Sequence, residues 1–479
     1  MKNTLIGRLF ILIVIVSLFG CKKDLKDIDP PPRPGGDEDR TAAQIVLDSV
    51  YSKYKYLSYW GSFIEVVNPI STLTDKYTDA DDLLSYLKRQ TPVQNGYIFH
   101  PALNGQPLDR FSWIEDIGST SDAAAKADLA DGYGLYMAFD GDRKDSLFVF
   151  FVEGGSPGEK AGIKRGDKVI EMEGDKKMVY SNQTKIDEYI EGSTLSIKIE
   201  GQNHIEKSYS LKYTSYDIQP FQLGKVFNEN GTKVGYIALS SFEELYSGGS
   251  DTKMKKGIDS TFTVFGTQNI SKLIVDLRYN GGGYVSSAIY LLNKIVNSSG
   301  NNKVMFKYDL NENLKKERDA GSQDFVDEIF KKSNTTEINN VVFLVSDYTA
   351  SASEIVISAL MPYANVKIVG YEGATYGKPV GFFREDISDD IGLWAASFKI
   401  VNANGFTDYW DGIKADYPNI NDNIYKQFGD PTEDMTSKGL SILNSSNAKA
   451  SSRATRVSNS ARGTIRELNK IPTRNMLKD

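Results

Sequence analysis

The chain has 479 residues, of which 40% are hydrophobic and 25% are charged, and its formal net charge is −7. This length exceeds that of one ordinary domain, so we expect a soluble protein of two to four domains. A mildly acidic chain offers no broad basic surface for a phosphate backbone, and we therefore expect no nucleic-acid partner.

The first 20 residues have the features of a secretory signal peptide. A basic start precedes an apolar run, residues 9–16, that is too short to cross a bilayer as a helix. Residues 18–21, Leu-Phe-Gly-Cys, resemble the bacterial lipobox, in which the cysteine is acylated after cleavage. Cys21 is the only cysteine in the chain, so it cannot form an internal disulfide. The alternative is an uncleaved signal with an incidental cysteine.

Acylation of Cys21 would anchor the protein to a membrane surface without spanning the membrane. We therefore expect a lipoprotein of the cell envelope. Lys22 and Lys23 lack the acidic neighbour that can retain lipoproteins at the inner membrane, which favours the outer membrane of a Gram-negative bacterium. Residues 21–40 are polar and rich in proline and glycine, so they are predicted to form a disordered tether.

A helical pattern of apolar residues begins near Thr41 and continues to Leu57, and a second helix is predicted over residues 80–88. These features indicate a small helical domain over residues 41–126. This segment contains His100, one of only two histidines in the chain, next to a phenylalanine and a proline. A histidine in such a setting is expected to have a structural role.

Residues 127–215 contain a pattern that closely resembles a PDZ domain of the bacterial protease type. The resemblance rests on Gly132, Tyr133, Gly134 and Leu135, on a strand that follows them, and on a glycine-rich segment with a short helix. Backbone amides of the loop from Gly132 to Leu135 could bind the carboxylate at the end of a peptide. The adjacent strand could then pair with the peptide main chain.

A catalytic segment is predicted from about residue 216. Strands are expected near residues 233–237, 272–278, 340–346 and 366–371, and helices near residues 285–296 and 353–363. This alternation implies a mostly parallel sheet with right-handed crossovers. Gly281, Gly282, Gly283 and Ser351 then lie at the carboxyl ends of strands, where the functional groups of such sheets collect.

Three motifs follow the PDZ-like segment in order: Asp-Leu-Arg-Tyr-Asn-Gly-Gly-Gly at residues 276–283, Ser-Ala-Ser-Glu at residues 351–354, and Gly-Lys at residues 377–378. Together they resemble the C-terminal processing peptidases of serine peptidase family S41. The resemblance covers residues 41 to about 430. It implies an α/β multidomain protein with a ClpP/crotonase-like βαβ peptidase core over residues 216–430. It also implies protein or peptide substrates and no cofactor or metal.

Both histidines lie outside the catalytic segment, so a Ser-His-Asp triad has no base there, and a neutral lysine is the alternative. Lys378 has no acidic residue within five positions on either side, and burial would lower the pKa of its amine. Ser351 would then be the nucleophile and Lys378 its base. By the resemblance, the oxyanion is stabilised by the backbone amides of Ala352 and of Gly282 or Gly283.

Simpler interpretations stay open for the same residues. Ser351 and Glu354 have the spacing of a capping box, in which the serine only caps a helix. Ser353 is a second candidate nucleophile, but the family motif favours Ser351, and we expect Ser353 to cap the helix. The three glycines could instead bind phosphate, although the spacing of a dinucleotide or P-loop motif is absent.

Phe382 departs from the family pattern, because many members have a glutamine four residues after the lysine, where it orients the amine. Phe382 could deepen the apolar wall around Lys378, or the site could be impaired. We expect a membrane-anchored serine endopeptidase with a Ser351/Lys378 dyad, whose PDZ domain binds substrate C-termini or gates the cleft. The alternative is a catalytically impaired lipoprotein that binds peptides as a scaffold.

The C-terminal part has a weaker pattern. Residues 392–401 and the turn at residues 402–405 predict a hairpin, and the catalytic domain is expected to end near residue 430. Residues 431–479 are predicted to form a polar, basic tail, which is of low complexity and disordered from Leu443 onward. This tail could serve as a ligand of the PDZ domain in the same chain.

Overall fold

The computed structural model describes residues 40–116, 129–139, 145–229, 231–445 and 466–467. The predicted signal peptide, Cys21 and the tether before residue 40 lie outside these residues. Among the described helices, none combines the length and the apolar character needed to cross a membrane.

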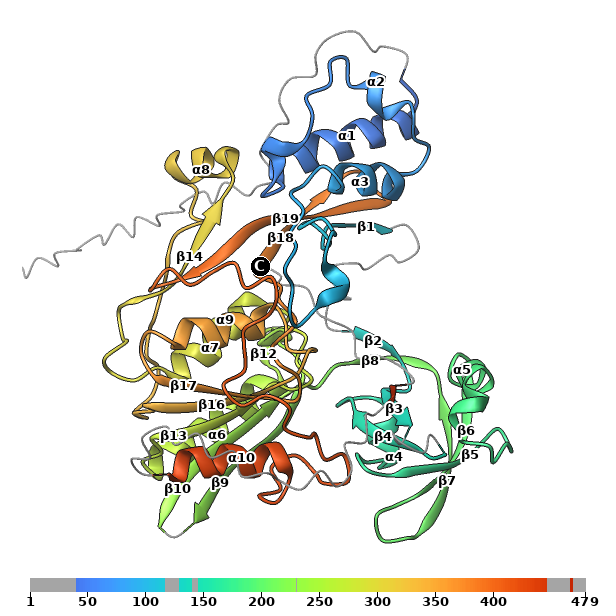
Figure 1. Cartoon of the computed structure of the whole chain (residues 1–479), viewed down its shortest axis with the longest axis vertical. Coiled ribbons are helices and arrows are strands. Elements are labelled where there is room, and N and C mark those ends of the chain that lie inside the picture. Colours follow the sequence, from blue (N-terminus) through green and yellow to red (C-terminus); the bar gives the residue numbers. More distant parts are fainter. Residues whose placement is uncertain (1–39, 117–128, 140–144, 230, 446–465, 468–479) are drawn as a thin grey trace, which may run out of the picture.

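The described residues form a mixed α/β structure of several parts (Figure 1). The helices are α1 (Ala42–Leu57), α2 (Ser71–Thr74), α3 (Ala80–Lys88), α4 (Pro157–Ala161), α5 (Gln183–Ile190), α6 (Lys253–Thr267), α7 (Val285–Ile295), α8 (Glu312–Asp319), α9 (Ala352–Leu360) and α10 (Asp434–Asn444). The first strands are β1 (Trp113–Asp116), β2 (Leu129–Gly132), β3 (Leu135–Phe139), β4 (Leu147–Val152), β5 (Lys168–Met172), β6 (Thr194–Glu200), β7 (Glu206–Lys212), β8 (Thr214–Asp217), β9 (Phe221–Glu229) and β10 (Thr232–Leu239). The remaining strands are β11 (Tyr246–Ser247), β12 (Ser250–Asp251), β13 (Lys272–Asp276), β14 (Val304–Leu310), β15 (Glu328–Ile329), β16 (Asn340–Val345), β17 (Asn365–Gly370), β18 (Val380–Asp386), β19 (Ile391–Asn402) and β20 (Arg466–Glu467).

The central sheet has the strand order β17-β16-β13-β10-β9. Four of its strands are parallel, and β9 pairs antiparallel with β10 at one edge. The prediction of a mostly parallel sheet is therefore confirmed. Side chains alternate between the two faces of a strand. Leu273 and Val275 accordingly pack in one core with α6, α7 and α9, whereas Ile274 packs in another core with α10.

A second sheet, β1-β19-β14-β15 with β18 also paired to β19, joins the N-terminal region to the rest of the chain. Strand β1 pairs antiparallel with β19, so that Trp113 lies opposite Trp394. In Figure 1, α1, α2 and α3 lie beyond this sheet, at the top of the view. Their buried side chains belong to the same hydrophobic core as α7 and α9. The N-terminal helices therefore share a core with the catalytic segment.

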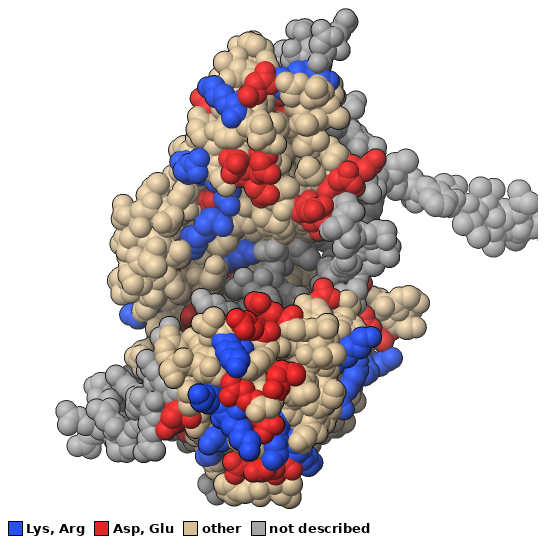
Figure 2. Space-filling view, turned by 90° about the vertical axis from the view of Figure 1, so that its right-hand side faces the viewer, with Lys and Arg blue, Asp and Glu red and all other residues tan. Residues whose placement is uncertain are grey.

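Residues 129–217, here called the second unit, have a hydrophobic core of their own. Their strands β3 to β7 form a sheet in the order β3-β4-β5-β6-β7, to which β20 adds at the β3 edge. In Figure 1 this unit lies at the lower right, beside the central sheet. Figure 2 shows lysine and arginine side chains interspersed with aspartate and glutamate over the lower part of the visible face, so neither sign forms a continuous patch there.

Two predictions for the C-terminal part are wrong. The hairpin partner of β19 is β18, which precedes it, because the register pairs Asp386 with Gly392. The predicted tail also begins too early, since residues 434–444 form α10. Met435, Leu440 and Leu443 place apolar side chains against the central sheet, and this face is enough to bury an otherwise polar helix.

Candidate active site

Ser351 lies at the turn between β16 and α9. Its backbone φ is 60° and its ψ is −118°, a conformation that costs a non-glycine residue on the order of 1–3 kcal/mol. A strained strand-to-helix turn is a recurring way to present a serine nucleophile. The Ser351 Oγ is fully buried and has no hydrogen-bond partner among the described residues. No described residue therefore engages this hydroxyl in a hydrogen bond that would have to break before it could react.

The capping-box spacing of Ser351 and Glu354 is only partly used. The Ser351 nitrogen donates to Glu354 Oε2, but the Glu354 nitrogen donates to the Ser351 carbonyl oxygen rather than to its hydroxyl. The prediction that Ser353 caps the helix is wrong, because α9 begins at Ala352 and the Ser353 hydroxyl donates to the Asn280 carbonyl oxygen at 3.0 Å. Ser353 thus holds the turn that contains Gly281, Gly282 and Gly283, here called the glycine turn, against the helix.

Glu354 joins the serine turn to the loop that carries Lys378. Its Oε2 accepts hydrogen bonds from the backbone nitrogens of Ser351 at 2.8 Å and Lys378 at 2.9 Å. Its Oε1 accepts from the Gly377 nitrogen at 2.9 Å and from the Thr375 hydroxyl. The backbone nitrogens of Ser351 and Lys378 are therefore no more than two hydrogen-bond lengths apart. Burial raises the pKa of this carboxyl group, although the four hydrogen bonds oppose the rise.

Lys378 is only 3% exposed, and its side chain lies against aromatic rings. Its Nζ is 4.5 Å from the centre of the Phe382 ring and 5.6 Å from that of Phe111. Burial lowers the pKa of this amine from 10.5 to about 7, while the charge of Glu354 raises it and the charge of Arg110 lowers it. Phe382, at the position of the family glutamine, thus forms part of the apolar wall.

Arg110 reaches the lysine loop from the N-terminal region. One of its guanidinium nitrogens donates to the carbonyl oxygens of Gly377 at 3.1 Å and Trp410 at 3.3 Å. His100, also from the N-terminal region, contacts the same loop, because its Nε2 lies 2.8 Å from the Thr375 carbonyl oxygen. The sequence interpretation missed Arg110 because no local motif surrounds it. It recognised Glu354 only as half of a capping box.

The glycine turn packs directly against Ser351. A Cβ atom at Gly282 would lie 2.7 Å from the Ser351 Cβ, and the φ of Gly282 is 106°, so only glycine fits this position. The Gly282 nitrogen donates to the Asn280 side-chain oxygen at 3.0 Å. The nitrogens of Gly283 and Ala352, by contrast, donate to no described residue. Ser351, Ala352, Gly282, Gly283 and Lys378 are thus brought together in one place.

A buried ionic cluster lies behind the glycine turn and crosses to the second unit. Arg278 pairs with Asp276, Asp422 and Glu433. Arg165, from the second unit, pairs with the same Asp422. It also donates to the hydroxyl of Tyr279, the residue next to Arg278. The ionic cluster therefore connects the second unit to the strand end from which the glycine turn emerges.

The predicted peptide-binding loop lies in the second unit, apart from Ser351. A cavity of about 190 Å³ is lined by Gly132, Tyr133, Gly134 and Leu135 together with side chains such as Ile190 of α5. At Gly134, φ is 65° and a Cβ atom would lie 2.1 Å from the Ser156 Cβ, which explains the glycine. Loop, strand β3 and helix α5 thus border one apolar recess.

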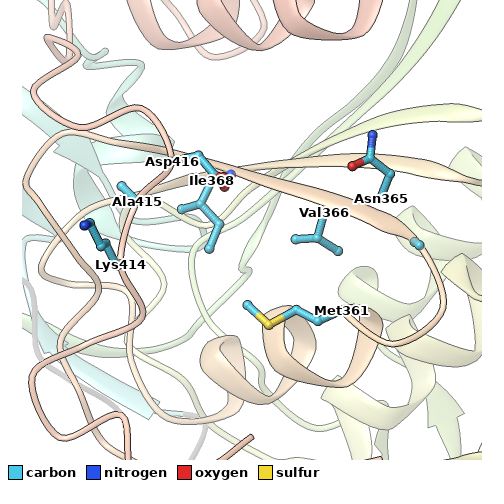
Figure 3. Close-up of a pocket in the computed structure, with 8 residues that line it drawn as sticks. Met361, Asn365, Val366, Ile368, Lys414, Ala415 and Asp416 are labelled. Carbon is cyan, nitrogen blue, oxygen red and sulfur yellow. Dashed lines mark hydrogen bonds between the residues drawn. The ribbon is translucent and has the colours of Figure 1, made fainter. Parts of the chain in front are cut away.

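A larger cavity of about 680 Å³ lies elsewhere (Figure 3). It is lined by Met361, Val366 and Ile368 and by residues 414–416. Met361 follows the last residue of α9 and Ser351 precedes the first, and a helix of nine residues spans about 13 Å. The larger cavity therefore does not contain the serine. Within the described ranges, no group of side chains has the composition of a metal site.

The sequence model of peptidase family S41 matches residues 233–418, which include the glycine turn, Ser351 and Lys378. These matched residues, here called the S41 domain, are therefore similar in sequence to peptidase family S41. The DLRYNGGG, SASE and GK motifs all lie within this domain.

Two curated proteins to which the chain is similar are probable CtpA-like serine proteases. The protein of Staphylococcus aureus is 24% identical over 275 residues, which are 57% of this chain and 50% of that protein. The protein of Staphylococcus haemolyticus is 24% identical over 264 residues, or 54% and 47% of the two chains. The matched region thus spans about half the length of these relatives.

The fold of the chain also resembles a solved structure. A protein of Bacteroides fragilis assigned to the S41 proteases superimposes with a TM-score of 0.61 at 20% sequence identity. The superposition covers 82% of this chain and 96% of the other. The multidomain α/β architecture is therefore shared well beyond the S41 domain itself.

Proposed function

We propose that this chain is a serine endopeptidase in which Ser351 is the nucleophile and Lys378 is its base. The observation that carries the proposal is the shared carboxylate of Glu354, which binds the backbone nitrogens of both residues through one oxygen. Support also comes from the unpartnered, buried Ser351 hydroxyl and from the lowered pKa of Lys378. A lysine with a pKa near 7 is largely neutral at physiological pH and can accept a proton.

Acylation begins when the Ser351 Oγ attacks the carbonyl carbon of a peptide bond. The hydroxyl proton passes to the Lys378 Nζ, and the carbonyl oxygen becomes an oxyanion. The backbone nitrogens of Ala352 and Gly283 are the proposed oxyanion donors, because both lack another described acceptor, whereas the Gly282 nitrogen is bonded to Asn280. Gly282 then contributes in another way: because it has no side chain, the glycine turn can pack against Ser351.

Collapse of the tetrahedral intermediate breaks the C–N bond. The leaving amine takes the proton from Lys378, and Ser351 remains as an ester of the N-terminal product. Lys378, neutral again, accepts a proton from a water molecule that attacks the ester. A second tetrahedral intermediate then collapses: the bond between the acyl carbon and the Ser351 Oγ breaks, Lys378 returns its proton to this oxygen, and the carboxylic acid is released.

We propose that the second unit corresponds to the PDZ domain predicted over residues 127–215 and binds the C-terminal ends of substrates. The glycine-containing loop beside β3 and the apolar recess against α5 support this assignment. Through Arg165 and the ionic cluster, the position of this unit can influence the glycine turn. Binding and gating are thus compatible roles for one domain.

Anchoring of the enzyme to the cell envelope is part of the same proposal. Cys21 would carry the lipid and residues 22–40 would form the tether, with the outer membrane of a Gram-negative bacterium as the expected site. Incorporation of a radiolabelled acyl chain tests this, because it should disappear in the Cys21→Ser variant. Undiminished labelling of that variant would refute the anchor.

The peptidase activity is tested on an unfolded protein substrate with the purified chain. Ser351→Ala and Lys378→Ala should each lower turnover by about 10³-fold or more. Ser260→Ala is the control and should retain the activity, since this serine is exposed on α6 and its hydroxyl bonds only to the Gly257 carbonyl oxygen of the same helix. If the unsubstituted chain is as inert as these variants while peptides still bind, the chain is a peptide-binding scaffold instead.

A further inference from the structure

Strand β20 adds a segment from the end of the sequence to the second unit. Arg466 lies opposite Phe139 and Glu467 lies opposite Ala138, in an antiparallel pairing with β3. The other edge of β3 is already paired with β4, so β20 occupies its outer edge. In Figure 1 this short red segment lies beside β3, although it is more than 300 residues away in sequence.

The direction of this pairing leads toward the apolar recess of the second unit. Because the strands are antiparallel, the step from Arg466 to Glu467 goes from Phe139 back to Ala138. It therefore points toward Leu135 and the loop that precedes it. This is also the direction in which a peptide must run for its main chain to pair with β3 and reach the recess.

We infer that the outer edge of β3 is a strand-addition surface whose resident partner is the C-terminal segment of this same chain, from Arg466 onward. This segment competes with peptide substrates for the recess. The inference rests on the proposed peptide-binding role of the second unit, and it adds the identity of the competitor.

Charge favours this occupant. Residues 446–479 contain eight lysines and arginines but only two acidic residues, whereas residues 129–217 contain 16 acidic and 12 basic residues. The signs are therefore complementary, which adds an attraction that does not depend on exact side-chain geometry.

Chain length also permits the contact within one molecule. Twenty-one residues, 445–465, connect the end of α10 to β20, and a chain of this length spans at most about 75 Å. A ligand joined to its site by a short connection within the same chain is held at an effective concentration on the order of 1 mM. A segment that binds with a Kd of roughly 0.1 mM would then weaken competing peptides by about tenfold.

The test measures peptide binding to the Ser351→Ala chain, so that no cleavage can intervene. The probe is a fluorescein-labelled peptide with the sequence of residues 462–479, and its anisotropy is followed on two proteins, the full chain and the chain ending at Ser445. We expect the shortened chain to bind the probe about tenfold more tightly. Equal affinities, or no binding to the shortened chain, would overturn the inference.

Two further variants show whether strand pairing is responsible. Arg466→Pro with Glu467→Pro removes both main-chain donors of β20, so the full chain should then bind the probe as tightly as the shortened chain. Ala450→Pro with Ser451→Pro, in the linker, is the matched control and should leave the affinity unchanged. A full chain unaffected by the first pair would contradict the pairing.

The same assay separates this inference from the proposed function. If the shortened chain binds unrelated C-terminal peptides but not the probe, only the inference about the resident segment fails. If it binds no peptide at all, the peptide-binding role fails with it. Because the resident segment belongs to the same molecule, its competition with the probe should be the same at protein concentrations from about 1 to about 50 μM. A dependence would mean that a second copy supplies the segment.

Discussion

Lys378 shows how the surroundings of one residue can make an ordinary amine into a base. Aromatic rings replace water around its Nζ, and the lowered pKa is the consequence of that burial. Two nearby charges oppose each other, since Glu354 raises this pKa and Arg110 lowers it. The Phe382 ring is part of the wall, so the missing family glutamine does not leave the amine in water.

The pH dependence of activity follows from this balance. If neutral Lys378 is the base, kcat/KM should rise with pH through a midpoint near 7. Arg110→Met removes a positive charge that favours the neutral amine, so the pKa of Lys378 should rise and the midpoint should move to higher pH. Arg89→Met, on the exposed end of α3, is the control and should not move it. A midpoint that is unchanged in Arg110→Met would show that Arg110 acts only through structure.

Glu354→Gln should move the same midpoint in the opposite direction. Loss of the negative charge removes an influence that raises the pKa of Lys378, so activity should persist to lower pH. The NH2 group of the glutamine amide would replace one of the two carboxylate oxygens and would face backbone N–H groups that now donate to an oxygen. For this reason kcat should fall by about 100-fold. A profile that shifts upward, or a kcat equal to that of the unsubstituted chain, would contradict the role given to Glu354.

The residues of the site differ in how far the sequence could reveal them. Ser351, Lys378 and the glycines stand in motifs that carry their own local signals, and all of them meet in the structure. Glu354 also stands in a motif, but its partners Gly377 and Lys378 are known only after the chain has folded. Arg110 lies more than 200 residues from the loop it contacts, and a single sequence holds no trace of that contact.

At the scale of elements, the turn after β13 and the turn before α9 act as one unit. Gly282 packs against Ser351, and Asn280 bonds to both turns through its backbone and side chain. The alternation of strands and helices allowed the parallel sheet to be predicted, since each strand has a strong apolar signal. The helix α10 was missed because its few apolar residues stand in a polar segment. Their role is visible only in the folded chain, where they pack against the central sheet.

Gly282→Ala tests whether these turns are fitted to each other. The added methyl group would collide with Ser351, so kcat should fall by about 100-fold or more while the fold persists. Gly174→Ala is the matched control, because its φ is also positive, at 80°, but its surroundings are empty. Both variants carry backbone strain, so equal activities would mean that contact between the turns does not matter.

For the whole molecule, the important contact is the one between the second unit and the S41 domain. Aromatic residues of β3 and β4 pack against Tyr279 and Tyr348, and Arg165 enters the buried ionic cluster. An isolated buried charge is costly, so the cluster favours the docked arrangement once all its partners are present. The sequence indicated two such units by motif, but no pattern within either one predicted that they meet at Asp422.

Arg165→Met should weaken this contact. Asp422 and Tyr279 would lose a buried partner, so limited proteolysis near residue 217 should become faster and kcat should fall several-fold. Lys164→Met, at the exposed neighbouring position, should change neither measurement. Faster proteolysis with unchanged kcat would show that the units are in contact without being coupled in catalysis.

The central claim is that Ser351 is activated by a neutral Lys378. The most direct measurement is the rate at which p-nitrophenyl acetate acylates the protein, with the modified residue located by mass spectrometry across pH 5 to 9, a range chosen to extend about two units to each side of the expected midpoint. The account predicts acetylation of Ser351 that increases with pH through a midpoint near 7 and is lost in Lys378→Ala. Acetylation of Ser353 instead, or labelling of Ser351 at an equal rate in Lys378→Ala, would contradict it.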